Sequence, residues 1–373
     1  MKRNLSFEEE TALKYWGPYP LNYPEIFNTH WLQFEKQPKL VLYLFGIFVA
    51  VVGVVSVIGN GLVCFTFLSS PSLRYKKAFV INVAMSDFIS PLLTYHLFVV
   101  SCFKGIWTFG EKVCTLYALI QGFCGLLSIV SLAVIAVERH AAIALPHSNF
   151  NNLSRRFQLK LLTCTWIYCL LVVIPPLFGF GKYVSAGFLT TCCFDYIERD
   201  WKTRGFIVYL FTLGLGVPMM IIIYCYIRIG IEAGKSEAGV LTESIPMSEN
   251  RQLNPINRRQ EAMTSRSIRK DLRIARMTLI VIVCFVAAWT PYGVAALLGQ
   301  FGPKGIVTPW MAMIPSVFAK SSTLYNPIVY AYKDVRFRRG FRKYVIGAPA
   351  ALLELSISLT TRVHHGLSNT AEP

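Results

Sequence analysis

Long apolar runs alternate with short polar segments over most of the chain. A helix rises about 1.5 Å per residue, so about 20 apolar residues cross the hydrocarbon core of a bilayer. Seven runs reach this length, at about residues 40–68, 77–103, 112–144, 157–180, 204–231, 272–299 and 307–332. The pattern predicts an all-α membrane protein built as a seven-transmembrane helix bundle.

Polar and amphipathic segments divide the rest of the chain. After the seventh run, Val335, Phe337 and Phe341 alternate with basic residues, which predicts a short amphipathic helix on the membrane surface. A long polar segment at about 232–271 is predicted to be a cytoplasmic loop. We therefore expect an extracellular segment at 1–39, the bundle at 40–332, the surface helix at 333–345 and a cytoplasmic tail at 346–373.

Composition and charge agree with a membrane protein. Of the 373 residues only 15% are charged, whereas soluble domains carry about 25%. The net charge is +17, and bases gather at Arg74, Lys76 and Lys77, at Arg155, Arg156 and Lys160, in 232–271, and from Arg336 to Lys343. Basic loops face the cytoplasm and its anionic lipid, so we expect a plasma membrane protein with its N-terminus outside. No nucleic-acid motif accompanies the bases, so nucleic acid is not an expected partner.

Two further signals concern the extracellular side and the cysteines. Asn4 begins an Asn-Leu-Ser sequon, which is a glycosylation site if that end is outside. Residues 1–38 lack the apolar core of a signal peptide, so no cleaved signal is expected. The ten cysteines show no metal-ligand spacing, so no metal site is expected.

Lys320 lies near the middle of the seventh run. An ammonium at the centre of a membrane helix costs at least about 2.5–3.5 kcal/mol, so such a lysine is rarely without a function. It can pair with a carboxylate or face an aqueous cavity. Alternatively, a lysine in a dry pocket is a good amine for condensing with an aldehyde to form a Schiff base.

Asn326, Pro327 and Tyr330 form an NPxxY sequence that begins six residues after Lys320. This combination resembles the seventh helix of the opsins, the retinal-binding branch of the rhodopsin-like G-protein-coupled receptors, in an invertebrate-type or divergent form. The resemblance implies a light-sensing receptor rather than an enzyme, with retinal held on Lys320 through a Schiff base. It also implies a heterotrimeric G protein activated on photoisomerisation, with arrestin and a receptor kinase as further partners.

The resemblance places a retinal pocket around the lysine. Trp289 and Tyr292 are expected at its floor and wall, and Gly125 is expected to leave room for a polyene. Aromatic residues at helical spacing are more often ordinary core, but in company with Lys320 we favour the pocket. The full set of expected pocket residues is Tyr117, Gln121, Gly125, Thr191, Trp289 and Tyr292.

Cys114 and Cys192 resemble the pair that joins the third helix to the second extracellular loop in this family. A disulfide is permitted in an extracellular compartment. The adjacent Cys193 is not excluded by the sequence, although the loop pattern with Asp195 favours Cys192.

Glu138 and Arg139 stand where the family has the first two residues of (D/E)RY, with His140 in place of tyrosine. Asp271, twenty residues before Pro291, matches the site at the cytoplasmic end of the sixth helix that would pair with Arg139. Solvated charges are the simpler alternative, but the paired spacing favours an ion pair that biases the inactive state. The expected coupling and switch residues are Glu138, Arg139, Tyr226, Asp271, Asn326, Pro327 and Tyr330.

Asp87 lies well inside the second span, and a buried carboxylate needs polar partners. Asn60, Ser128 and Asn326 are the polar residues expected at its depth. The set resembles the polar water or sodium cluster of rhodopsin-like receptors. A purely stabilising role and a switching role both remain open.

A protonated Schiff base on Lys320 would be a buried cation and would need a negative partner. The positions that resemble the family's carboxylate sites hold the neutral Tyr117 and Ala186, and two alternative sites hold Phe98 and Ser316. Asp87 is expected about 9 Å away along the helix axis. Three outcomes are open: a neutral imine, contact with Asp87 through water, or a bound chloride or other anion. We favour the bound anion.

Two other functions could use the same fold. An ordinary ligand-activated receptor is one, although Gln121 stands where amine receptors place an aspartate, which argues against amines but not against peptides. A retinal photoisomerase is the other, and it would use the same lysine to supply chromophore. Such an isomerase would not need Arg139, Asp271 and Tyr330, so the presence of these residues favours signalling.

Overall fold

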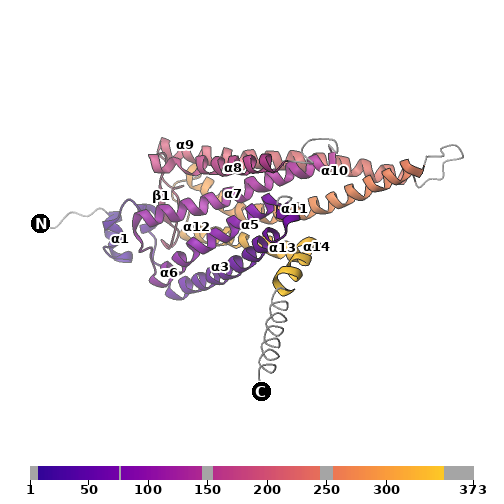
Figure 1. The fold of residues 1–373 in the computed structure, drawn as a ribbon. Coiled ribbons are helices and arrows are strands. Elements are labelled where there is room, and N and C mark those ends of the chain that lie inside the picture. The colour runs from indigo at the N-terminus through magenta and orange to yellow at the C-terminus, as the bar shows by residue number, and fades with distance from the viewer. Residues whose placement is uncertain (1–6, 75–76, 145–153, 244–254, 348–373) are drawn as a thin grey trace, which may run out of the picture.

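The computed structural model describes residues 7–74, 77–144, 154–243 and 255–347, and its long helices run side by side along one direction (Figure 1). The bundle is formed by α3 (Lys39–Leu68), α5 (Ala78–Ser90) with η2 (Pro91–Tyr95) and α6 (His96–Lys104), α7 (Gly110–Ala144), α8 (Arg155–Val173), α9 (Trp201–Tyr209) with η5 (Leu210–Gly216) and α10 (Val217–Glu243), α11 (Pro255–Phe301), and α12 (Pro309–Ser321) with η6 (Ser322–Leu324) and α13 (Tyr325–Lys333). The predicted seven-helix membrane fold is confirmed.

The outward face of the bundle is apolar, as a lipid-facing surface must be. On α3, Leu44, Val51 and Ile58 recur every seven residues, and each stays more than half exposed, at 58–59%. Among the described helices, six are long and apolar enough to cross a membrane by length and composition. Such faces are far too large and continuous to be left in water, and lipid covers them at no hydrophobic cost.

The seventh predicted span consists of two α-helices joined by a tighter turn. The sequence predicted one run at 307–332, whereas α12 ends at Ser321 and the turn η6 intervenes before α13. The backbone at this break is satisfied from outside the helix, because Asn60 on α3 donates from Nδ2 to the carbonyl of Thr323 at 2.9 Å. A bilayer supplies no water for a freed carbonyl, so a neighbouring helix must provide the donor.

The fourth span is shorter than the predicted 157–180. Helix α8 ends at Val173 and is followed by the 3₁₀ turn η4 (Pro175–Phe178). Pro175 and Pro176 lack backbone N–H groups, so they cannot continue the helical hydrogen-bond ladder.

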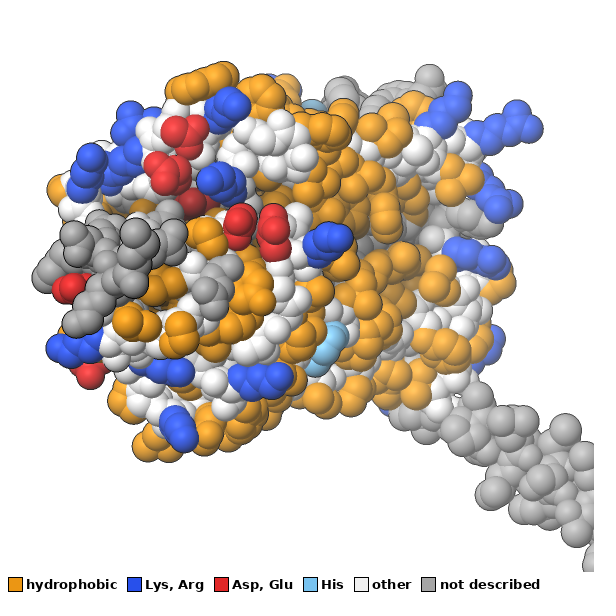
Figure 2. All heavy atoms as spheres, turned by 90° about the vertical axis from the view of Figure 1, so that its left-hand side faces the viewer, with side chains coloured by type: hydrophobic (Ala, Val, Ile, Leu, Met, Phe, Trp, Pro, Cys, Tyr) orange, Lys and Arg blue, Asp and Glu red, His pale blue; other side chains and the backbone are white. Residues whose placement is uncertain are grey.

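A hairpin and the N-terminal segment close the end of the bundle that carries the N-terminus. Strands β1 (Tyr183–Ala186) and β2 (Thr191–Phe194) pair antiparallel, with Ser185 opposite Cys192. The N-terminal elements α1 (Phe7–Trp16), η1 (Pro20–Asn22) and α2 (Thr29–Leu32) lie beside them, and the N–H of Ser185 donates to the carbonyl of Ile26 at 2.8 Å. On this face, acidic side chains stand close to basic ones among hydrophobic side chains (Figure 2).

At the opposite end, α10 and α11 project together beyond the other helices (Figure 1). The loop predicted at 232–271 is therefore largely helical, since α10 continues to Glu243 and α11 begins at Pro255. These extensions are rich in Glu, Ala, Arg, Lys and Gln, which are good helix formers even where no apolar stripe marks a span. The predicted amphipathic segment forms α14 (Val335–Phe341) and the wider turn η7 (Arg342–Ile346). The short helix α4 (Pro71–Arg74) lies between the first and second spans. Asn4 and the tail beyond residue 347 lie outside the described residues.

Candidate functional site

A cavity of about 400 Å³ lies inside the bundle and falls within the size range of small-molecule sites. Its lining is mostly apolar and includes Lys320 together with four of the residues predicted to form the pocket: Gln121, Gly125, Trp289 and Tyr292. The other two predicted pocket residues, Tyr117 and Thr191, do not line the cavity. Their hydroxyl groups hydrogen bond to each other at 3.1 Å. The structure thus brings most of the predicted pocket around one amine.

Lys320 is the penultimate residue of α12, and its side chain is 9% exposed. Its Nζ donates to Ser316 Oγ at 3.3 Å, one helical turn earlier. The same Nζ lies 5.7 Å from the ring centroid of Phe98 and 5.8 Å from that of Tyr117. Within the described part of the chain, no carboxylate lies within ion-pair distance of this amine.

Three of the four positions considered for a counterion therefore face the amine, and all three hold neutral residues. Aromatic faces within about 6 Å attract a cation weakly through their quadrupoles. Ala186, the fourth position, lies buried in β1. Among the described lining residues Asp87 is the only acid.

Trp289 is packed directly against Gly125. A Cβ atom at Gly125 would lie 2.8 Å from the Trp289 ring, so only glycine fits there without moving the indole. Trp289 also stacks on Phe285, with centroids 5.6 Å apart, and its Nε1 donates to Ser322 Oγ at 3.2 Å. The indole is thus held by α7, α11 and the break in the seventh span.

The side-chain amide of Gln121 forms hydrogen bonds with two residues of the second span. Its Oε1 accepts from Ser90 Oγ at 2.8 Å, and its Nε2 donates to Thr94 Oγ1 at 2.9 Å. The side chain therefore contributes a fixed polar patch to the cavity wall.

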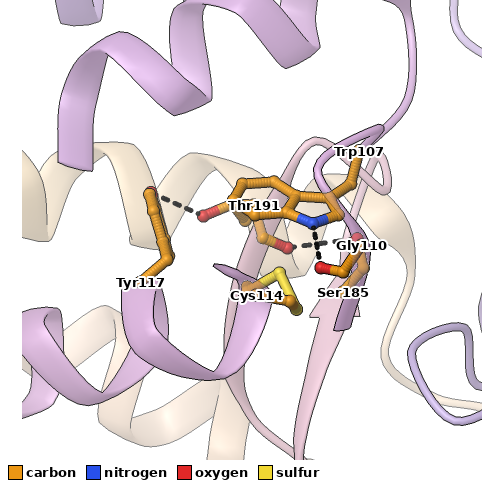
Figure 3. The surroundings of a disulfide bond; sticks show 7 residues. Trp107, Gly110, Cys114, Tyr117, Ser185 and Thr191 are labelled. Carbon is orange, nitrogen blue, oxygen red and sulfur yellow. Dashed lines mark hydrogen bonds between the residues drawn. A yellow bond between two sulfur atoms is a disulfide. The ribbon is translucent and has the colours of Figure 1, made fainter. Parts of the chain in front are cut away.

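The structure joins Cys114 and Cys192 in a disulfide with their Cα atoms 5.4 Å apart. This bond ties the start of α7 to strand β2, close to the Tyr117–Thr191 contact (Figure 3). Cys193 keeps a free thiol and lines the cavity. The hairpin is thereby held over one end of the cavity.

Asp87 receives hydrogen bonds from two of the three predicted partners. Ser128 Oγ donates to its Oδ1 at 3.2 Å, and Asn326 Nδ2 donates to its Oδ2. Among the described contacts, Asn60 instead binds the carbonyls of Ser56 and Thr323. Asn60 therefore supports the break in the seventh span, while Asp87 links α5, α7 and α13.

The predicted switch residues gather toward the end of the bundle opposite the hairpin and the N-terminal elements. Arg139 and Asp271 form an ion pair at 3.2 Å, and their side chains are 19% and 21% exposed. Tyr226 donates its hydroxyl to the carbonyl of Ala275 at 3.0 Å, which connects α10 to α11. Tyr330 is buried in the core of this half, and Pro327 packs so closely against α3 that a Cβ at Gly59 would lie 3.0 Å from it. Glu138 precedes Arg139 on α7.

A second ion pair was not anticipated. Lys77 Nζ lies 3.1 Å from Asp334 Oδ2, and the two side chains are only 6% and 7% exposed. The sequence places Lys77 only among the bases between the first two spans, and its partner is 257 residues away, so no local pattern could reveal the pair. Asp334 also caps α14 by accepting from the N–H groups of Arg336 and Phe337.

Two opposing effects act on the pKa of Asp334. Burial raises the pKa of the carboxyl, whereas the charge of Lys77 and the hydrogen bonds from Lys77, Arg336 and Phe337 lower it. The net result is a pKa below the ordinary value, so the carboxyl group of Asp334 is ionised at neutral pH.

Comparison with known proteins gives consistent matches over most of the chain. The family described as 7 transmembrane receptor (rhodopsin family) matches residues 59–330. A rhodopsin of Loligo forbesii is 34% identical, over 83% of this chain and 67% of the relative. A rhodopsin of Mizuhopecten yessoensis, named as GQ-coupled, is 33% identical, over 88% of this chain and 64% of the relative. The crystal structure of squid rhodopsin aligns with a TM-score of 0.77 at 33% identity, over 87% of this chain and 91% of that one.

Proposed function

The chain belongs to the rhodopsin family of seven-transmembrane receptors, among the opsins, and we therefore propose that it carries retinal on Lys320 and activates a heterotrimeric G protein in response to light. The observation that carries the proposal is the buried amine of Lys320 in an apolar cavity, without a carboxylate partner among the described residues. Such an amine is desolvated and available to an aldehyde.

The residues around the amine fit an elongated apolar ligand. Gly125 was expected to leave room for a polyene, but the Trp289 indole fills the space beside it, and Trp289 and Tyr292 supply flat apolar walls to the cavity. Retinal supplies light absorption and a change of shape when bound. The chain's own part is to hold the amine, exclude water with the disulfide-tied hairpin, and present Trp289 to the changing shape.

The contacts that hold the resting state are distributed along the bundle. Trp289 is tied to Ser322, Asp87 to Asn326, and Arg139 to Asp271. A ligand shifts such an equilibrium only through different contacts in the two states. We infer that displacement of the indole loosens this series and lets α11 move away from α7 at the cytoplasmic end.

A bound anion beside the imine, chloride or another small ion, is the counterion we propose. Phe98, Tyr117 and Ser316 face the amine and are neutral. Tyr117 and Thr191 share one hydrogen bond, which uses only one of their two hydroxyl hydrogens and leaves the other to donate. Asp87 is already bonded to Ser128 and Asn326, which disfavours it as the partner.

The remaining partners and the location follow from the same proposal. The Mizuhopecten relative named as GQ-coupled supports coupling to a G protein. We further propose the plasma membrane as location, with the N-terminus outside, and arrestin, a receptor kinase and membrane lipid as other partners. The orientation is supported by the bases that the sequence places between the first and second spans, between the third and fourth, and after the seventh, which are segments on the same side of a seven-span bundle.

Nucleotide exchange on a purified G protein, measured in darkness and in light after loading with retinal, tests the function. The wild-type protein should accelerate exchange in light, and Lys320→Ala should lose this response while still reaching the membrane, since it removes a buried charge. Equal exchange in light and dark by retinal-loaded wild-type protein would contradict the proposal.

A further inference from the structure

Tyr95 lies at the end of the wide turn η2 in the second span, and its side chain is 2% exposed. Its ring fits against α3 because residue 53 is glycine. A Cβ atom at Gly53 would lie 3.3 Å from the Tyr95 ring, tighter than ordinary contact. The turn and the glycine together direct the phenol across the bundle toward α12.

The phenol reaches the backbone of the very residue that bears the amine. Tyr95 donates its hydroxyl to the carbonyl oxygen of Lys320 at 2.8 Å. Thr323 Oγ1 donates to the same carbonyl at 3.0 Å and hydrogen bonds to Ser56 Oγ on α3 at 2.7 Å. This carbonyl is located just before the turn η6, where the regular hydrogen-bond ladder of the helix is interrupted.

The same turn of helix also faces the amine itself. Phe98 follows Tyr95 by three residues and therefore lies on the same side of its helix. Its ring is 5.7 Å from Lys320 Nζ. One segment thus contacts the lysine at two points: Tyr95 hydrogen bonds to its backbone carbonyl, and Phe98 lies beside its side-chain nitrogen.

We infer that Tyr95 is a positioning residue for Lys320, one that fixes the backbone from which the amine extends and so sets the surroundings of the nitrogen. The inference rests on the proposed function of Lys320. When the hydroxyl is lost, the lysine backbone gains freedom, and the nitrogen shifts relative to Phe98, Tyr117 and Ser316. The packing of the ring is preserved if phenylalanine replaces tyrosine.

The test compares Tyr95→Phe with Tyr168→Phe. Tyr168 also donates its hydroxyl to a backbone carbonyl, that of Leu213 at 2.7 Å, and it does not belong to the cavity lining described above. Both proteins are loaded with retinal, and their absorption spectra and dark reaction rates with hydroxylamine, which attacks the imine, are measured. Tyr95→Phe should shift the absorption maximum and raise the hydroxylamine rate about two- to tenfold, the range for one hydrogen bond. Tyr168→Phe should leave both as in the wild type.

Gly53→Ala provides a second route if Tyr95→Phe fails to fold, because the added methyl group displaces the ring while the hydroxyl remains. It should move the spectrum and the rate in the same direction by a smaller amount. A folded Tyr95→Phe or Gly53→Ala pigment with wild-type spectrum and rate, or equal changes in Tyr168→Phe, would overturn the inference. Wild-type protein that takes up no retinal would instead contradict the proposed function.

Discussion

The amine of Lys320 is surrounded by an aromatic and hydroxyl shell rather than by a carboxylate. Phe98 and Tyr117 each place a ring within 6 Å of Nζ, and Ser316 accepts its hydrogen bond. Cation–π attraction contributes roughly 0.5–2 kcal/mol, which is small beside the cost of burying an unpaired cation. Because these neighbours are neutral, a protonated imine needs an additional anion to balance its charge.

Replacement of chloride by a larger or non-coordinating anion should shift the absorption maximum and the apparent pKa of the imine. The proposed counterion is a bound ion that exchanges with solution, so a different anion changes the charge distribution beside the imine. Tyr117→Glu supplies a fixed carboxylate next to the nitrogen and should make the spectrum indifferent to the anion. A visible pigment that ignores anion exchange but changes in Asp87→Asn would show that Asp87 is the partner after all.

Among the helices that the structure describes, two ion pairs join helix ends at the side of the bundle opposite the hairpin. The pair between α7 and α11 is partly exposed, and the pair between Lys77 and the start of α14 is nearly buried. Partly exposed pairs contribute little to stability but can bias a balanced equilibrium. The two pairs are therefore expected to behave differently when broken.

Asp271→Asn should raise nucleotide exchange in the dark by about two- to fivefold, which corresponds to the loss of up to about 1 kcal/mol from the resting state. Glu111→Gln, at the opposite end of the bundle, removes the same charge and serves as the control. Unchanged dark exchange in Asp271→Asn at equal expression would mean that the pair does not restrain the receptor.

Asp334→Asn should lower the thermal stability of the protein in detergent, because it leaves Lys77 buried without its anion. Removing one partner of a buried ion pair costs about 3–5 kcal/mol of stability. Since asparagine still caps a helix, the lost stability measures the effect of the missing charge. Replacing Lys77 by methionine in the same protein should restore part of the stability. If the double variant is as unstable as the sum of the singles, the two residues are not coupled.

The same pair gives a pH dependence. The pKa of Asp334 is lower in the folded protein than its ordinary value, so its contribution is fully present above about pH 4 and is lost as the pH falls through the folded pKa. The stability difference between wild-type protein and Asp334→Asn should therefore shrink at acid pH.

At the scale of the whole molecule, periodicity and length were sufficient for the helices but not for their interruptions. The apolar run around Lys320 looks continuous, and the tight turn there is tolerated because side chains donate to its backbone carbonyls, Asn60 to that of Thr323 and Tyr95 to that of Lys320. The polar segment at 232–271 reads as a loop because no apolar stripe marks it, yet its composition favours helix.

The site was predictable where a residue type is rare in its setting. A lysine in mid-membrane and an aspartate in the second span are costly, so their positions alone attract attention. Tyr95 carries no such signal, because a tyrosine in an apolar run is ordinary. Its contact with Lys320 spans 225 residues and depends on the space at Gly53, which appears only in three dimensions.

Locating the retinal adduct tests the proposed role of Lys320 directly. The protein is loaded with retinal in the dark, the imine is reduced with borohydride, and the digested peptides are mapped by mass spectrometry. The peptide containing Lys320 should carry the retinyl group, and Lys320→Ala should carry none. An adduct on any other lysine, or a pigment that forms equally well in Lys320→Ala, would contradict it.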